Sequence, residues 1–219
     1  VIEEKNEAPT SDKQVEDKST STYGDSNTAS IGDVVDYKVT ITVKDGAKGY
    51  ALHDEMSEGL TYDPSSLKIQ VSKVDVAVEN YSHKYATAVE DENKPTDACD
   101  FEIIFNDDYL AGLAKGTQII VTYSAKLNEN AIIAGTGNTN DSYLEYGEKV
   151  DVNGDGTPDD KPKTPDDSTK TYTYKFDLVK TDKDNKVITG ATFALYDAAT
   201  GGNLIGLVKE GDIYRIATK

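Results

Sequence analysis

The sequence predicts an all-β protein built from β-sandwich domains in tandem. Three observations support this class. Apolar residues recur at every second position in several short segments, and turn-forming residues separate these segments. No helical repeat is long enough for a βαβ unit. The composition agrees, because 14 Tyr against 4 Phe and no Trp is typical of a polar, strand-rich extracellular domain.

The clearest strand is expected over residues 34–43, whose alternate side chains are all apolar. One face of this segment carries Val35, Tyr37, Val39, Ile41 and Val43. Further strands are expected at 50–56, 66–74, 101–105, 117–127 and 140–147. Between them, the pattern predicts a loop over 57–66 and one short helix within 107–115.

Changes in composition divide the chain. Residues 1–12 are polar and form a linker or the lead-in to a first strand, and residues 13–168 form the larger sandwich. Periodicity is lost over residues 147–170, so 147–168 is expected to be an acidic loop at the end of this domain. Strand signals resume at 171–219, which is short for a complete sandwich and is therefore expected to be a partial second domain.

The charge and the single cysteine exclude several classes of protein. The chain of 219 residues carries 23 Lys and Arg against 40 Asp and Glu, a net charge of −17. Such an acidic surface argues against nucleic-acid partners and against anionic membranes, and no apolar stretch is long enough for membrane insertion. Cys99 alone cannot form an intramolecular disulfide or a multi-thiolate metal cluster. A secreted chain of this kind needs another means of stabilisation, such as a covalent or metal cross-link.

The acidic segment over residues 151–160 has the spacing of a calcium loop. Oxygen ligands at alternate positions can converge on one Ca²⁺, and Gly156 would provide the sharp turn. An EF-hand is not expected, because Pro162 occupies the twelfth position and neither flank looks helical. The alternative interpretation is a solvated acidic linker that binds no metal. The candidate ligands are Asp151, Asn153, Asp155, the Thr157 carbonyl, and Asp159 or Asp160.

The two histidines and the cysteine carry little signal in the sequence. The neighbours of His53 and His83 offer no second ligand at a metal-binding spacing, so both are interpreted as ordinary strand residues. Cys99 lies in a polar segment with no histidine nearby in sequence. It is therefore interpreted as a half-buried residue at a strand end rather than as a nucleophile.

Several short motifs in order resemble a known family. The runs are DKQV at 12–15, IGDVVDYKVTI at 31–41, HDEMSEGLTY at 53–62 and GNTNDSYLEY at 137–146. Together they resemble the isopeptide-forming middle domain, similar to a collagen-adhesin A-type domain, of backbone pilins from Gram-positive sortase-assembled pili. The later runs FDLVKTD at 176–182 and GATFALYD at 190–197 resemble the start of a collagen-adhesin B-type domain. The resemblance implies immunoglobulin-like sandwiches.

The resemblance also implies an internal cross-link in the larger domain. A lysine on the first strand, here Lys13, would attack the side-chain amide of an asparagine on the last strand. That asparagine is Asn140 or, as the alternative, Asn138, and Asp54 would relay protons. Asn140 is preferred because it shares strand parity with Leu144, while Asn138 has the same parity but lies closer to the Gly-rich turn. In the second domain, Lys180 occupies the family's cross-linking position.

General chemistry supports this assignment. An amine is a nucleophile only when neutral, and burial lowers the pKa of a lysine while raising that of a carboxylic acid. A neutral acid can then donate a hydrogen bond to the amide oxygen and protonate the leaving nitrogen. The reaction would occur once per molecule and would need no cofactor. The chain is thus not expected to be an enzyme with turnover.

The function implied by the resemblance is structural. The chain would be part of a pilus shaft subunit in an extracellular, cell-wall-anchored surface fibre, joined to other pilin subunits by sortase. An alternative is a surface adhesin that binds host matrix or glycan through its loops. The Tyr-Pro-Lys context of the polymerising lysine and a C-terminal sorting signal are both absent, so we expect an internal fragment of a longer subunit.

Overall fold

The computed structural model describes residues 8–148, 154, 161–210 and 213–216. Within these residues strands dominate, and no helix is long and apolar enough to cross a membrane. The one α-helix described, α1 (Asp107–Ala111), begins after Asn106, whose side chain accepts a hydrogen bond from the Asp108 amide. Two short 3-10 turns, η1 (Val78–Asn80) and η2 (Asp91–Asn93), flank the edge strand β8.

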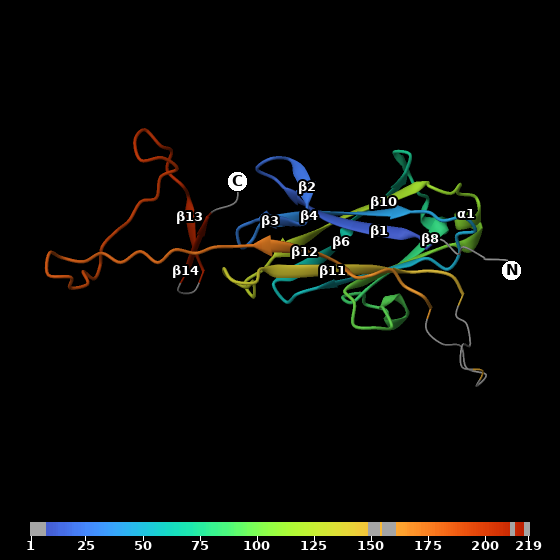
Figure 1. The fold of residues 1–219 in the computed structure, drawn as a ribbon. Helices are drawn as coiled ribbons and strands as arrows, with labels where there is room; N and C mark the ends of the chain where they lie inside the picture. Colours follow the sequence, from blue (N-terminus) through green and yellow to red (C-terminus); the bar gives the residue numbers. More distant parts are fainter. Residues whose placement is uncertain (1–7, 149–153, 155–160, 211–212, 217–219) are drawn as a thin grey trace.

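Two six-stranded sheets form the larger part of the molecule (Figure 1). Sheet A contains, in spatial order, β2 (Thr22–Gly24), β1 (Thr10–Asp17), β4 (Val34–Thr42), β10 (Gln118–Leu127), β6 (Leu60–Val71) and β7 (Val74–Asp75). Sheet B contains β3 (Ser26–Thr28), β12 (Asp167–Tyr172), β11 (Asn138–Glu145), β5 (Ala51–Met56), β9 (Phe101–Phe105) and β8 (Tyr81–Tyr85). Neighbouring strands are antiparallel except β12 and β3, which are parallel.

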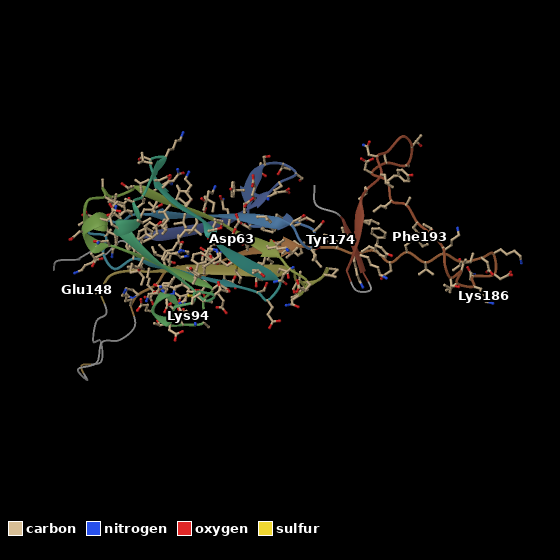
Figure 2. All side chains as sticks on the ribbon, turned by 180° about the vertical axis from the view of Figure 1, so that it is seen from behind. Asp63, Lys94, Glu148, Tyr174, Lys186 and Phe193 are labelled. Atoms are coloured by element: carbon tan, nitrogen blue, oxygen red, sulfur yellow. The ribbon has the colours of Figure 1, made fainter. Side chains whose placement is uncertain are left out.

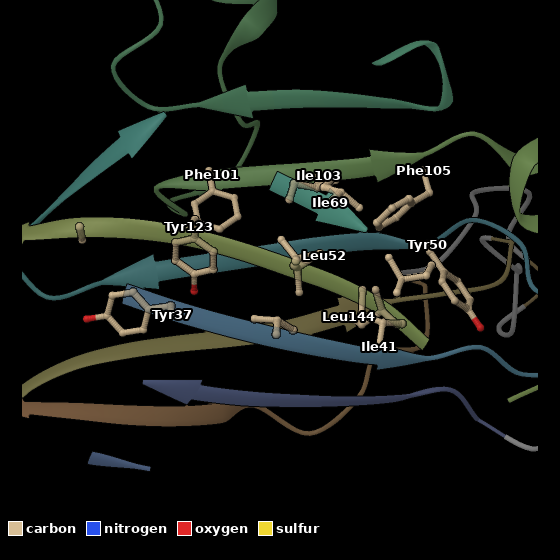
Figure 3. Close-up of a cluster of buried hydrophobic side chains, with 14 of the residues drawn as sticks. Tyr37, Ile41, Tyr50, Leu52, Ile69, Phe101, Ile103, Phe105, Tyr123 and Leu144 are labelled. Carbon is tan, nitrogen blue, oxygen red and sulfur yellow. The ribbon is translucent and has the colours of Figure 1, made fainter. Parts of the chain in front are cut away.

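The core lies between the inner faces of the two sheets. The face predicted for residues 34–43 is buried from Val35 to Val43, as strict alternation requires. The rings of Phe101, Tyr123 and Tyr37 gather at one end of this core, Phe105 and Tyr50 lie at the other end, and aliphatic side chains lie between them (Figure 3). The expected all-β sandwich is confirmed.

Most predicted strands are present. β2, β3 and β8 lie where no strand was expected, and two further departures have an identifiable cause. Residues 57–66 were expected to be a loop, yet β6 begins at Leu60. The sequence pattern failed there because residues 64–67, which include Pro64, lie opposite Tyr123 where the register shifts, and such an irregularity interrupts the alternation.

The second departure lies at the end of the segment 147–170, where no strand was expected and where residues 147–168 were expected to form an acidic loop. β12 starts at Asp167 and pairs with β11 from Asn138↔Thr171 to Ser142↔Asp167. Its inward side chains are Thr169 and Thr171, which are buried although polar. The threonines hid this strand, because a polar inner face shows no hydrophobic alternation. The strand also crosses the expected domain boundary at 168–171.

Few of the residues described after β12 belong to strands. Isolated bridges join Thr181 to Val187 and Tyr196 to Leu204. A hairpin of β13 (Leu207–Glu210) and β14 (Ile213–Ile216) follows. Several large side chains of this segment are exposed, among them Tyr174 and Phe193, which Figure 2 labels outside the sandwich.

Candidate cross-link site

Strand β1 carries a lysine into the core. Lys13 and Val15 occupy the buried positions of this strand, and Lys13 lies opposite Val39 of β4. The Lys13 side chain is 0% exposed. A buried ammonium loses its hydration, so a lysine at this position needs polar partners in the core.

The opposite sheet supplies those partners. In β5, Leu52 and Asp54 point into the core, and in β11 the core-facing positions include Asn140 and Ser142. Asp54 and Asn140 are both fully buried. Because Asp54 pairs with Ser142, two residues from Asn140, the carboxyl and the amide lie close together on one inner face.

The four polar groups form one connected network. The Lys13 Nζ donates to Asn140 Oδ1 at 2.8 Å and forms a buried ion pair with Asp54 Oδ2. Tyr123 of β10 completes the network. Its hydroxyl accepts from Lys13 Nζ at 2.8 Å and from Asn140 Nδ2 at 3.3 Å, and donates to Asp54 Oδ2. The structure thus brings Lys13, Asp54 and Asn140, the three residues named from the resemblance, into contact.

Tyr123 is the member of this network that sequence reasoning missed. Its parity offered a signal, since it alternates with Val121 and Ala125 on the core face of β10. The Tyr123 ring is stacked on Tyr37 at 5.3 Å between centroids and meets Phe101 edge-on at 4.8 Å (Figure 3). These rings wall the network from water on the side of the aromatic cluster.

Burial changes the acid–base properties of the site. Loss of hydration lowers the pKa of Lys13, although the neighbouring Asp54 carboxylate acts in the opposite direction. Loss of hydration likewise raises the pKa of Asp54, opposed by Lys13. Both shifts favour the uncharged forms, an amine and a carboxylic acid, over an ammonium and a carboxylate. The pKa of Tyr123 lies well above its ordinary value for the same reason, so its hydroxyl keeps its proton.

Asn138 also faces the core but has other partners. Its Oδ1 accepts from the Ile132 amide at 2.8 Å, and its Nδ2 donates to the carbonyls of Ile132 and Thr171 at 3.2 and 3.1 Å. Gly59 packs so closely on it that an added Cβ would lie 2.2 Å from Asn138 Oδ1. This asparagine therefore fastens the segment before β11, whereas Asn140 faces the lysine.

β12 supports the site from the side. The Lys13 amide donates to Asp167 Oδ2 at 2.7 Å, and Thr169 Oγ1 donates to the Asn140 carbonyl at 3.3 Å. The resemblance placed the asparagine on the last strand of the domain. In the structure β12 follows β11 in the same sheet, so the asparagine strand is the penultimate one.

The remaining candidate residues lie elsewhere. Lys180 is exposed on the segment between β12 and β13, where its carbonyl accepts from the Ile188 amide at 2.8 Å. The candidate calcium ligands Asp151, Asn153, Asp155, Thr157, Asp159 and Asp160 lie outside the described residues.

One known protein family matches the sequence. The profile of the family described as Gram-positive pilin backbone subunit 2, Cna-B-like domain, matches residues 31–150, more than half of the sequence. The chain belongs to this family of Gram-positive pilin backbone proteins. A comparison with curated proteins gave no match.

Solved structures with a similar fold include several pilins. The T6 backbone pilin of serotype M6 Streptococcus pyogenes is 26% identical with a TM-score of 0.60, over 97% of this chain and 46% of that chain. The pilus backbone RrgB of Streptococcus pneumoniae is 24% identical with a TM-score of 0.50, over 66% of this chain and 33% of that one. The major pilin BcpA of Bacillus cereus is 12% identical with a TM-score of 0.50, over 76% and 41%. The chain therefore spans less than half the length of each of these pilins.

Proposed function

We propose that this chain is part of a shaft subunit of a Gram-positive surface pilus, and that Lys13 and Asn140 join in an autocatalytic isopeptide bond. Membership of the pilin backbone family supports the first part. The single observation that carries the second is the 2.8 Å contact between Lys13 Nζ and Asn140 Oδ1 in a fully buried site. The subunit would be joined to other pilin subunits by sortase, outside the cell and anchored to its wall.

The reaction follows from the positions of the four groups. Once Asp54 takes a proton from the ammonium, the Nζ lone pair attacks Cγ of Asn140 and the Nζ–Cγ bond forms. The Asp54 acid then gives its proton to Nδ2 and the resulting carboxylate takes the second proton from Nζ, so that the Cγ–Nδ2 bond breaks and ammonia leaves. Tyr123, hydrogen-bonded to Asp54 and Asn140, holds both groups in place. Atoms balance as amine plus primary amide giving secondary amide plus ammonia.

The fold accelerates formation of the proposed bond by holding the two reacting groups together. Lys13 and Asn140 lie on facing sheets, so folding brings the amine and the amide into contact without a diffusional step. The rings of Tyr37 and Phe101 keep water away, which favours the neutral reactants and limits competing hydrolysis. The site acts once, because its own side chains are consumed.

Intact-mass measurement tests the bond. The purified chain should be lighter than its sequence by the mass of one ammonia. Asn140→Ala removes the acceptor while leaving the lysine and its acid partner in place, and its mass should equal its own sequence. Asn138→Ala is the matched control, an inward asparagine of the same strand, and it should still lose ammonia. A full sequence mass for the unaltered, folded chain would refute the bond.

A separate experiment tests the cellular role. Antibodies raised against the chain should label fibres on the surface of the producing cells in immunoelectron microscopy. High-molecular-weight ladders that survive boiling in detergent should carry the same epitope, because sortase joins subunits covalently. Labelling confined to the cell wall, without fibres or ladders, would refute the pilus role and leave the internal bond untouched.

A further inference from the structure

A second polar cluster lies on the outer face of sheet B, behind the cross-link site. In β5, Asp54 points into the core and the adjacent His53 points the other way, because side chains alternate along a strand. The connection from β8 to β9, residues 86–100, folds over this outer face and buries the His53 side chain, which is 7% exposed. Two residues of that connection, Asp97 and Cys99, approach the imidazole.

Three metal-ligating atoms converge there. His53 Nδ1 lies 2.9 Å from Asp97 Oδ2 and 3.7 Å from Cys99 Sγ, and all three atoms are within 4.8 Å of one another. A tetrahedral zinc ion with bonds of about 2.0–2.3 Å separates neighbouring ligand atoms by about 3.3–3.8 Å. Small movements of the 97–99 segment would therefore bring all three atoms to bonding distance.

The second imidazole nitrogen of His53, Nε2, lies near carboxylates, as it does in many metal-bound histidines. His53 Nε2 lies 3.6 Å from Glu102 Oε1, contributed by the paired strand β9, and 3.8 Å from Glu145 Oε2. Within the described residues, His53 Nε2 and Glu102 Oε2 are buried atoms without a hydrogen-bond partner. A metal on Nδ1 places the ring proton on Nε2, where it can be donated to Glu102, the carboxylate–histidine–metal arrangement of many sites.

The surroundings suit a cation with one open position. A pocket of about 460 Å³ adjoins the cluster, and its lining includes Asp97, Cys99 and Tyr143. Glu55, Asp141 and Asp166 outnumber Lys163 among its other charged residues, which makes the pocket acidic. The Tyr143 ring stacks on His53 at 4.7 Å and holds the imidazole plane.

We propose that His53 Nδ1, Asp97 Oδ2 and Cys99 Sγ bind one divalent transition-metal ion of the zinc type, with a fourth position open to the pocket. The mixed nitrogen, oxygen and sulfur ligands suit Zn²⁺ rather than Ca²⁺ or Mg²⁺, which prefer oxygen alone. Binding converts the thiol and the aqueous ion to a thiolate–metal bond with release of one proton to water. The ion would tie the 86–100 connection to β5, independently of the isopeptide bond.

Calorimetric titration with Zn²⁺ tests the site on the whole 219-residue chain, without a tag, after treatment with a chelator that is then removed. One equivalent should bind. Cys99→Ala should weaken binding by more than tenfold, and Glu102→Gln, which keeps all three ligands, by about 10–100-fold. Asp91→Asn, an exposed carboxylate of the same connection, and His83→Gln, the other histidine, are matched controls and should bind as the unaltered chain does. Circular dichroism verifies the fold of each variant.

Cobalt provides a readout specific to the thiolate. Co²⁺ should produce a thiolate-to-metal charge-transfer absorption in the near ultraviolet, and this band should be absent from Cys99→Ser. Zinc binding that is unchanged by Cys99→Ala would show adventitious binding to surface carboxylates and overturn the proposal. An absence of any uptake of Zn²⁺ or Co²⁺ by the unaltered chain would also overturn the proposal.

Discussion

The buried lysine shows how two unfavourable residues make one favourable site. Lys13 or Asp54 alone in this core would be an uncompensated buried charge, which costs several kcal/mol. Together, with Tyr123 and Asn140 as hydrogen-bond partners, each offsets the cost of the other. The same burial that makes the charges costly moves both pKa values toward neutral, reactive forms.

His83 gives a pH-dependent prediction at the same scale. Loss of hydration lowers its pKa to about 4, and its Nε2 lies 2.9 Å from the Tyr62 hydroxyl, with the rings of Tyr85 and Phe101 nearby. The folded pKa is below the unfolded value of about 6.5, so protonation favours the unfolded chain. The contribution of His83 is complete above about pH 6.5 and is lost as the pH falls toward 4.

Proton NMR of the imidazole resonances measures this directly. The His83 signal should titrate with a midpoint near 4. In addition, His83→Phe should lose less stability between pH 7 and 5 than the unaltered chain in parallel denaturant titrations. A His83 midpoint at the ordinary value near 6.5 would contradict the prediction.

At the scale of elements, strand β5 serves two purposes through its alternation. Its inward side chains contribute Leu52 to the core and Asp54 to the cross-link site, and its outward His53 faces the 86–100 connection. Because β5 is central in sheet B, neighbours on both sides hold it rigidly. A central strand is therefore suited to present reactive groups with little positional freedom.

We expect strand β12 to be the last strand that the sandwich domain needs for complete cross-linking. It covers the edge of β11, and Asp167 and Thr169 bond to β1 and β11. A chain shortened to residues 1–175 should fold and lose ammonia completely. A chain shortened to 1–166 should be cross-linked only in part, because the open edge of β11 admits water next to Asn140. Intact mass measures both, and equal, complete cross-linking in the two chains would show that β12 is dispensable.

At the scale of the whole molecule, the proposed bond would join the two sheets to each other. Lys13 is in sheet A and Asn140 in sheet B, 127 residues apart in sequence. Closing a loop of this size removes entropy from the unfolded chain and stabilises the fold by about 4–5 kcal/mol in the loop-entropy model. The proposed bond would give a chain with a single cysteine a cross-link that reduction cannot break.

Thermal unfolding measures this contribution. Asn140→Ala should lower the Tm by about 10–20 °C, which is the expected effect of 4–5 kcal/mol on a domain of this size. Ser142→Ala is the matched control, since Ser142 is buried on the same face of β11 and its hydroxyl has no hydrogen-bond partner among the residues that the structure describes. Its Tm should stay within a few degrees of that of the unaltered chain. A similar Tm for Asn140→Ala would contradict the stabilising role.

Much of the fold could be predicted from residue patterns, and the residues of the candidate site were implied by the resemblance of short motifs to a known family. Alternation identified the core strands, and parity placed Asn140 inward with Leu144. Motif order pointed to Lys13, Asp54 and Asn140, which the structure brings into one network. The strands were predictable because a period of two is a local property, whereas the roles of Lys13, Asp54 and Asn140 were implied by the resemblance and not by periodicity.

The remaining features depend on contacts between residues far apart in the chain. Tyr123 joins the network only because β10 and β5 face each other across the core, and Cys99 meets His53 across 46 positions. Asn138 and Asn140 share strand parity, and only their partners distinguish them. β12 has threonines where a hydrophobic strand would have valines, so its place in the sheet was set by pairing with β11. Such contacts arise from chain packing, which no local period encodes.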